Sequence, residues 1–330
     1  MAVSAFSAQA GFDTLGATGS ASVQPGRNPE HWQSRWHTLN RETKSRMPEL
    51  PEVETMRRGI LAITGARIED VVRLPCRLKP LQIYPRIDVF RRRTVDRHIA
   101  QVGRVGKRVI LLLDSGDRIV FEPRMTGLVL LADPPSSEHL RFRLDLSGNI
   151  SHVWFWDRRG LGNVRLLSPD EFHEQLGPHK VGTDALELKP GEMRDRLCGS
   201  RRAVKVALLD QRAIAGIGNL YASEILHQAG VHPEKSCDRV EGEEWDRIHV
   251  ATREILKTAI RCEGSTLSDG TYRNALNQSG GYQHHHRVYD RADQPCVVCR
   301  TGTVQRIVQA QRATFFCSTC QPKRRPRKRK

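Results

Sequence analysis

The sequence predicts an α+β fold made of three parts in chain order: a β domain, a helical domain and a small metal-binding module. Short apolar runs separated by turn residues fill 66–167, which is typical of antiparallel strands. From about residue 190 the apolar residues recur at helical spacing. Two Cys-x-x-Cys pairs stand near the end of the chain. A length of 330 residues accommodates two or three such domains.

Two hairpins define the β domain. Strand-like runs over 107–113 and 118–122 flank the turn Asp-Ser-Gly-Asp, and runs over 140–146 and 150–156 flank Ser-Gly-Asn. Several short strands at this spacing predict a sandwich or a barrel.

A helix is predicted ahead of these strands, from Pro51 onward. Acidic residues come early in it and two arginines late, as the helix dipole favours. We expect Gly65 to end it. Its core-facing residues are Val53, Met56, Ile60 and Ile63.

The helical domain is predicted to contain helices over 201–210, 219–229 and 243–263. The third helix is expected to end at Gly264 and to be followed by a Gly/Ser/His-rich loop that reaches about residue 290. Its apolar face consists of Trp245, Ile248, Ile255, Leu256 and Ala259.

The four clustered cysteines predict a zinc site. A hairpin between the two pairs would bring four thiolates into a tetrahedron, which suits Zn²⁺; a redox pair is the alternative, and the doubling of the motif argues against it. A site closed by four sulfurs has no open position for catalysis, so the zinc is expected to be structural. The predicted ligands are Cys296, Cys299, Cys317 and Cys320.

The charge indicates a polyanionic partner. The formal net charge is +16 and the pI is near 9.9, and the last ten residues carry seven Lys or Arg. Nucleic acid is the commonest partner of such a chain; the alternative is that the charge serves only solubility. No apolar run is long enough for a membrane span, and no secretory signal is recognisable. Of the eight cysteines, four form two tight pairs and four are scattered, a pattern that suits a reduced cytosol with one metal site and not a disulfide framework.

Pro48 is chemically special only if it is a chain terminus. A terminal proline has a secondary amine that can attack an aldehyde-like carbon, whereas the nitrogen of an internal proline is an amide. We expect residues 1–46 to be a disordered extension or a mis-assigned start ahead of Met47. Glu49 and Glu52 flank this nitrogen; they could transfer protons there, or could merely favour the helix dipole.

Three further motifs are suggestive only in combination. Lys107 precedes an apolar strand and could reach a phosphate. Asn219 follows Gly-Ile-Gly, where it could cap a helix whose free amides attract phosphate. Arg159 and Leu161 lie in Asp-Arg-Arg-Gly-Leu-Gly, a loop that could wedge into a base stack. Each also has a plain structural interpretation as a solvated or turn residue.

In this order the motifs resemble the formamidopyrimidine-DNA glycosylase family. The resemblance runs from Met47 to about Gln321. It rests on Pro-Glu-Leu-Pro-Glu-Val-Glu-Thr, Gly-Lys before a hairpin, Arg-Met-Thr-Gly, Asp-Arg-Arg-Gly-Leu-Gly, Gly-Ile-Gly-Asn-Leu-Tyr-Ala-Ser-Glu, and Gln-Arg-Ala-Thr-Phe-Phe-Cys within the four-Cys hairpin.

The resemblance implies an N-terminal two-layer β-sandwich with flanking helices, a C-terminal helix-two-turns-helix domain and a zinc-finger hairpin. The implied domains are 47–180 (catalytic), 181–290 (DNA-binding, with the lesion loop), 291–321 (zinc finger) and 322–330 (basic tail).

The resemblance also implies a role for each matching residue. Pro48 is the nucleophile, Glu49 the acid/base on the opened sugar, and Glu52 its support. Lys205 lies near the site, whereas Lys107, Asn219 and Arg312 bind phosphates. Met125, Arg159 and Leu161 fill the void left by the extruded base.

The implied activity is excision of oxidised purines from duplex DNA followed by strand cleavage, by a monomeric, cytoplasmic, nucleoid-associated enzyme of bacterial type. Two alternatives stay open: an endonuclease VIII-like glycosylase for oxidised pyrimidines, and a non-catalytic damaged-DNA-binding protein if 1–46 are retained.

The sequence departs from the family pattern in three places. Leu161 stands where the family usually has Phe, and the lesion loop 267–283 is only loosely similar. The extension before Met47 is additional. His284, His285 and His286 are interpreted as free surface imidazoles without a metal.

Overall fold

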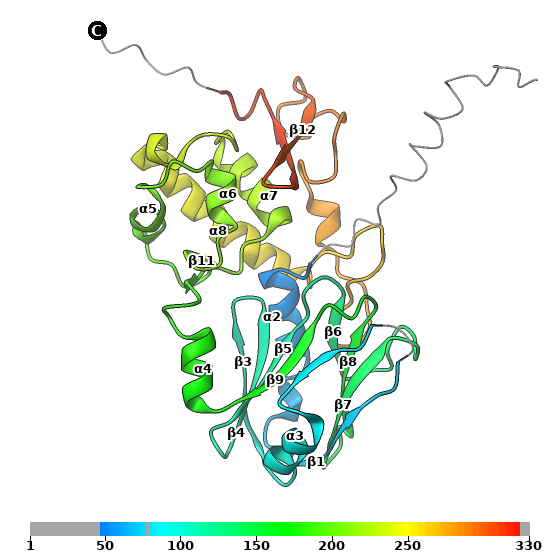
Figure 1. Cartoon of the computed structure of the whole chain (residues 1–330). Coiled ribbons are helices and arrows are strands. Elements are labelled where there is room, and N and C mark those ends of the chain that lie inside the picture. Colours follow the sequence, from blue (N-terminus) through cyan, green and yellow to red (C-terminus); the bar gives the residue numbers. More distant parts are fainter. Residues whose placement is uncertain (1–46, 77–78, 324–330) are drawn as a thin grey trace, which may run out of the picture. The chain divides into compact units, whose positions relative to one another are not determined.

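The computed structural model describes residues 47–76 and 79–323. The extension predicted for 1–46 and all but the first two residues of the basic tail lie outside the described residues. The predicted α+β class, with a sandwich, a helical part and a cysteine hairpin, is confirmed (Figure 1).

The β domain consists of two sheets. One sheet has the strand order β1-β7-β8-β6 and is antiparallel. The other has the order β2-β9-β5-β4-β3, in which β2 runs parallel to β9 and the other neighbours are antiparallel. The elements are α2 (Leu50–Gly59), η1 (Leu61–Ile63), β1 (Ile68–Arg73), β2 (Gln82–Tyr84), α3 (Ile87–Thr94), β3 (Ile99–Val105), β4 (Arg108–Leu113), β5 (Arg118–Glu122), β6 (Gly127–Leu130), β7 (Leu140–Leu146), β8 (His152–Asp157), β9 (Asn163–Leu167) and α4 (Pro169–Leu176).

Both predicted hairpins are present. β4 pairs with β5, and β7 pairs with β8, within two residues of the predicted bounds. The apolar faces of the two sheets and of α2 share one core, so the sandwich is the alternative that forms. Phe121 is in ring contact with both Phe142 and Phe155 within it.

The prediction that the first helix reaches Gly65 is wrong, because α2 ends at Gly59 and a 3-10 turn follows. A Cβ on Gly59 would lie 2.4 Å from Ala275 Cβ, so the segment that carries Ala275 packs closely against the end of α2. Ile60 and Ile63 are nevertheless fully buried, as predicted. Helix α2 contacts β3, β4, β6 and α8, so its first turn lies where sheet and helical residues meet.

The helical part has its own core. The predicted helix over 201–210 is shorter than expected, and the other two are confirmed within two residues. Trp245 and the other four predicted core residues of the long helix are buried. The elements are β10 (Thr183–Asp184), α5 (Glu192–Leu197), α6 (Val204–Leu208), β11 (Ile214–Ala215), α7 (Asn219–Ala229), η2 (Cys237–Arg239), α8 (Gly242–Arg261), η3 (Tyr282–His285), β12 (Val304–Gln309) and β13 (Arg312–Cys317).

The expectation of three free surface imidazoles is wrong for one of them. His284 and His285 are exposed, but His286 is only 9% exposed and its Nε2 lies 3.0 Å from Ser265 Oγ. The ring therefore ties the end of the 264–290 loop to its start. Within the described residues, no helix is long and apolar enough to cross a membrane.

Candidate active site

Pro48 and Glu49 directly precede α2, and hydrogen bonds fix the backbone at Glu49 and Leu50. Glu49 is the N-cap in an extended conformation, and its N–H donates to Glu52 Oε2 at 3.0 Å. The next amide, of Leu50, donates to the carbonyl of Gly216 at 3.1 Å. This part of the chain is therefore held from both sides, by its own helix and by the turn before α7.

The Glu49 carboxylate lies against the N-terminus of α7. Its oxygens accept the N–H groups of Leu220 at 2.9 Å and Tyr221 at 3.4 Å. A Cβ on Gly218, the N-cap of α7, would lie 2.2 Å from Glu49 Cδ, so only glycine leaves room for the carboxylate. Burial raises the pKa of Glu49, and the charge of Lys107 and these N–H groups oppose the rise.

The amides of Leu220 and Tyr221 at this helix terminus bind the Glu49 carboxylate, because a helix N-terminus attracts a nearby anion. One expectation about this terminus is wrong. Asn219 does not cap α7; it is the first helical residue. Its Nδ2 donates to the carbonyl of Ala313 at 2.9 Å, and its Oδ1 accepts from Lys205 Nζ. Asn219 thus joins α7 to the zinc hairpin.

Glu52 is the second buried acid, only 4% exposed. Its Oε1 accepts from the Tyr221 hydroxyl at 2.6 Å and from the Ser265 N–H at 2.9 Å. Burial, and next the neighbouring charge of Glu49, raise the pKa of Glu52 to about 7. A carboxyl group with this pKa exchanges its proton near neutral pH.

Three cations lie near these acids or near one another. Burial lowers the pKa of Lys107, and the Glu49 charge opposes this. Burial and then the Arg312 charge lower the pKa of Lys205 to about 8, although Glu49 opposes both. Arg312 itself is exposed at the start of β13. The structure therefore brings Lys107, Lys205 and Arg312 into one electrostatic neighbourhood with Glu49; their roles in one site stay a prediction.

A buried ion network holds the turn that carries Lys107. Arg104 donates from Nε to Glu54 Oε2 at 3.0 Å and from Nη1 to the carbonyl of Gly106 at 3.0 Å. It also pairs with Asp184, so α2, the β3–β4 turn and β10 share one guanidinium. Although burial alone would raise it, the bonds from Arg57, Arg58 and Arg104 lower the pKa of Glu54 to about 2.

The predicted void-filling residues lie on two adjoining loops. Arg159 Nη1 lies 3.4 Å from Met125 Sδ, so these two side chains meet. The buried Asp157 carboxylate accepts from Thr126 Oγ1, from the Arg159 N–H at 3.2 Å and from the Gly162 N–H at 2.7 Å. Asp157 thereby fixes the loop that presents Arg159 and Leu161.

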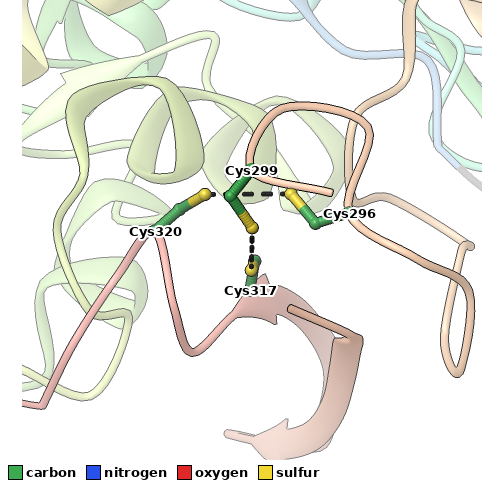
Figure 2. Close-up of side chains that lie close together, drawn as sticks. All are labelled: Cys296, Cys299, Cys317 and Cys320. Carbon is green, nitrogen blue, oxygen red and sulfur yellow. Dashed lines mark hydrogen bonds between the residues drawn. The ribbon is translucent and has the colours of Figure 1, made fainter. Parts of the chain in front are cut away.

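Figure 2 shows the four cysteines converging between the zinc hairpin strands and the preceding turn. Their Sγ atoms all lie within 4.8 Å of one another, and the pairs Cys296–Cys320 and Cys299–Cys317 are 3.8 and 3.7 Å apart. A tetrahedron with Zn–S bonds of about 2.3 Å requires sulfurs about 3.8 Å apart. The residues therefore fit one structural Zn²⁺. His227 Nε2 lies 3.5 Å from Cys296 Sγ, a contact the sequence did not predict.

A cavity connects the groups around Pro48. It is lined by Met47, Pro48, Glu49, Glu52, Leu220, Ser265, Leu267, Asp269 and Tyr272. Its volume of about 20 Å³ is room for about one water molecule and not for a nucleobase. Met47 contributes one wall, so its removal would widen the cavity beside the proline nitrogen.

Sequence reasoning missed the partners of the acids. Tyr221 lies in the Gly-Ile-Gly-Asn-Leu-Tyr-Ala-Ser-Glu motif, but nothing in the sequence indicates that its hydroxyl binds Glu52. Ser265 and Asp269 come from a loop without periodicity, and Asp157 was noticed only as a loop boundary. Tyr221, Ser265 and Asp157 act through contacts with residues distant in sequence, and Asp269 is notable only because it lines the cavity. Such features are not visible in the sequence.

The fold and site define a class: a DNA glycosylase of base excision repair, built from a catalytic sandwich, a helical domain and a structural zinc hairpin. Three family models match in order: the formamidopyrimidine-DNA glycosylase N-terminal domain over 47–164, its H2TH domain over 181–271, and the zinc finger found in FPG and IleRS over 293–323.

Whole-chain relatives agree. The formamidopyrimidine-DNA glycosylase of Chloroflexus aurantiacus is 38% identical over 278 residues, covering 83% of this chain and 98% of the relative. That of Bacillus subtilis is 34% identical over 285 residues, covering 84% and 100%. The chain belongs to the formamidopyrimidine-DNA glycosylase family.

Solved structures show the same fold. The MutM (Fpg) protein of Thermus thermophilus superposes with a TM-score of 0.72 at 35% identity, covering 83% of this chain and 98% of the other. The Lactococcus lactis Fpg, solved in complex with DNA containing an abasic site, gives 0.74 at 28% identity, covering 83% and 100%.

Proposed function

We propose that this protein is a bifunctional glycosylase and abasic-site lyase that removes oxidised purines, namely 8-oxoguanine and formamidopyrimidines, from duplex DNA. The observation that carries the proposal is the cavity in which Pro48 adjoins two buried, hydrogen-bonded carboxyl groups. These acids are held by residues from α7 and from the 264–290 loop, so they are in place before any substrate arrives.

The nucleophile is the amine of Pro48 after removal of Met47. Its nitrogen attacks C1′ of the damaged nucleotide, the glycosidic bond breaks, and the base leaves with a proton. Glu49 protonates the ring oxygen as the sugar opens, leaving a cationic iminium (Schiff base) between Pro48 and C1′. The family match begins at residue 47, which supports Met47 as the working start.

The positive charge of the iminium acidifies the C2′ protons. Loss of one proton expels the 3′ phosphate by β-elimination, and a second elimination expels the 5′ phosphate. Glu52, whose pKa is raised to about 7 by burial and by Glu49, can accept and return protons through this sequence at neutral pH. The zinc would be bound by its four cysteines as a brace for the hairpin and takes no part in the chemistry.

DNA would be gripped through its phosphates by Lys107, Asn219 and Arg312, with Lys205 beside them. Asn219 and Lys205 both contact the carbonyl of Ala313, which supports a single surface formed by the α7 end and the zinc hairpin. Met125, Arg159 and Leu161 would occupy the gap left by the extruded base, offsetting part of the unstacking cost.

We further propose that the enzyme acts as a monomer on damaged double-stranded DNA in a bacterial cytoplasm, associated with the nucleoid. The proposed domains are 47–180, 181–290 and 291–321, followed by the basic tail.

Borohydride trapping on abasic-site DNA tests the nucleophile. A chain that begins at Pro48 should give a covalent adduct, and Pro48→Gly should reduce its yield strongly. The 330-residue form should give none, because its Pro48 nitrogen is an amide. An equal yield from the intact 330-residue chain would place the nucleophile elsewhere, for example at Lys205.

Two duplex substrates test the lesion class. We expect faster excision of 8-oxoguanine opposite C than of thymine glycol opposite A. The reverse preference would identify an endonuclease VIII-like enzyme, and DNA binding without any adduct would identify a non-catalytic binding protein.

A further inference from the structure

A buried histidine touches the zinc site without belonging to its four ligands. His227 lies in the last turn of α7 and is only 4% exposed. Its Nε2 lies 3.5 Å from Cys296 Sγ, close enough for an N–H···S hydrogen bond. Its Nδ1 is buried without a hydrogen-bond partner among residues 47–76 and 79–323. The contact with the cysteine is therefore what orients the ring.

The unpartnered Nδ1 indicates where the His227 ring carries its proton. A neutral imidazole has one N–H and one lone pair. A proton on Nδ1 would leave a buried donor without an acceptor, which proteins avoid. A proton on Nε2 points the N–H at Cys296 Sγ and leaves only a lone pair unpaired. The geometry therefore favours His227 as a donor to the sulfur.

A zinc site of this kind needs such donors. Four thiolates around one Zn²⁺ leave a net negative charge, and here that charge is enclosed, because Cys296 and Cys317 are 1% and 0% exposed. Enclosed charge is tolerated where hydrogen bonds reach it. The Gly302 N–H donates to Cys299 Sγ at 3.3 Å. His227 can serve Cys296 in the same way, from a different element of the fold.

The same contact attaches the zinc hairpin to α7 at a second point. In the first turn of the helix, Asn219 Nδ2 donates to the Ala313 carbonyl in β13. His227 follows eight residues later, roughly 12 Å further along the helix axis. The two contacts thus hold the hairpin and the turn before it near both ends of α7.

We propose that His227 is a positioning residue of the zinc site, whose Nε2–H donates to the Cys296 thiolate. The bond offsets part of the enclosed negative charge and fixes the direction of the sulfur, so the protein holds its zinc more tightly. Partners that orient metal ligands in this way contribute about 10- to 100-fold to metal affinity. The role concerns zinc retention and is independent of the lesion that the enzyme excises.

His227→Phe tests this, because it keeps an aromatic ring and has no donor. Competition with a chromophoric chelator should show a zinc affinity lowered by about 10- to 100-fold. His227→Gln places an amide N–H near the position of Nε2 and should recover most of the loss. His249→Phe is the matched control, since His249 is also buried but its Nε2 contacts the Leu188 carbonyl. Its zinc affinity should equal that of the parent protein.

Cobalt substitution gives a readout that packing alone does not move. A hydrogen bond lowers the energy of the sulfur lone pairs, so the sulfur-to-cobalt charge-transfer band of His227→Phe should lie at longer wavelength than in the parent protein. His227→Gln should restore it. In the parent protein loaded with an NMR-active cadmium isotope, the Nε2 proton of His227 should show scalar coupling to the metal through Cys296 Sγ. This measurement needs no substitution, so it stands even if a variant does not fold.

Three results would overturn the proposal. An unchanged affinity and charge-transfer band in His227→Phe would mean that no hydrogen bond reaches the sulfur. Equal impairment of His227→Phe and His227→Gln would mean that the shape of the ring matters and not its donor. Absence of the coupling in the cadmium-loaded parent protein would mean that the Nε2 proton is not shared with Cys296.

Discussion

The zinc hairpin and the catalytic junction around Glu49 and Glu52 are built in opposite ways. The four zinc ligands lie within 25 consecutive residues and close their site completely. In the junction, Glu49 binds Leu220, which is 171 positions away in the sequence, and Glu52 binds Ser265, which is 213 positions away. The junction also leaves a cavity. The hairpin is therefore stabilised by one metal ion, whereas the junction depends on burial and on long-range hydrogen bonds. The two regions should fail under different perturbations.

Removal of zinc should have the largest effect and should separate the two regions. Cys317→Ser, or chelation, should unfold the hairpin, because metal binding supplies its folding energy. Arg312 and the Ala313 carbonyl would then leave Lys205 and Asn219, and DNA affinity should fall by about tenfold or more. Fluorescence anisotropy with labelled duplex measures this.

Cys198→Ser is the matched control, since Cys198 is exposed and outside the cluster. Hydrogen exchange should show the amides of Leu220 and Ser265 still protected in the zinc-free protein. Loss of this protection would contradict the proposed difference between the two regions, because the junction would then depend on the metal as well.

The pH dependence of the protein's stability tests the junction, because Glu52 titrates there. In the folded protein Glu52 has a pKa of about 7, against 4.5 as its ordinary value. The folded state therefore binds the Glu52 proton more tightly, and this contribution to stability is lost as pH rises from about 4.5 to about 7. The loss is at most on the order of 3 kcal/mol.

Glu52→Gln removes this titration. Its melting temperature relative to the parent protein should rise between about pH 5 and about pH 8, and the exposed Glu187→Gln should show no such trend. The slope is the readout, because the glutamine amide also faces the Glu49 N–H and adds a constant penalty. A flat difference would show that Glu52 is charged throughout and that the junction tolerates two adjacent carboxylates.

The same contrast explains what could be predicted from the sequence. The hairpins, the long helix and the zinc ligands were predictable because each depends on short-range spacing, as in the two Cys-x-x-Cys pairs. The close packing of Ala275 against Gly59, the last residue of α2, was not, because the two residues meet only in the tertiary structure. Pro48 and Glu49 were identified as candidates by chemistry and resemblance, but the binding of Glu49 to the α7 amides required the tertiary structure.

Glu224 links the two regions and gives the smallest expected effect. Its buried carboxylate accepts the N–H groups of Arg287, Val288 and Tyr289, at 2.8 to 3.2 Å, at the end of the 264–290 loop just before the zinc hairpin. Glu224→Gln should destabilise the protein by about 2 kcal/mol, because hydrogen bonds to a charged acceptor are stronger than those to an amide. Denaturant unfolding measures the change, with the exposed Glu243→Gln as control. If the linkage is mechanical, hydrogen exchange should also accelerate at 287–289 while the Glu49-bound amide of Leu220 stays protected; uniform acceleration would show instead that loop, hairpin and junction open as one unit.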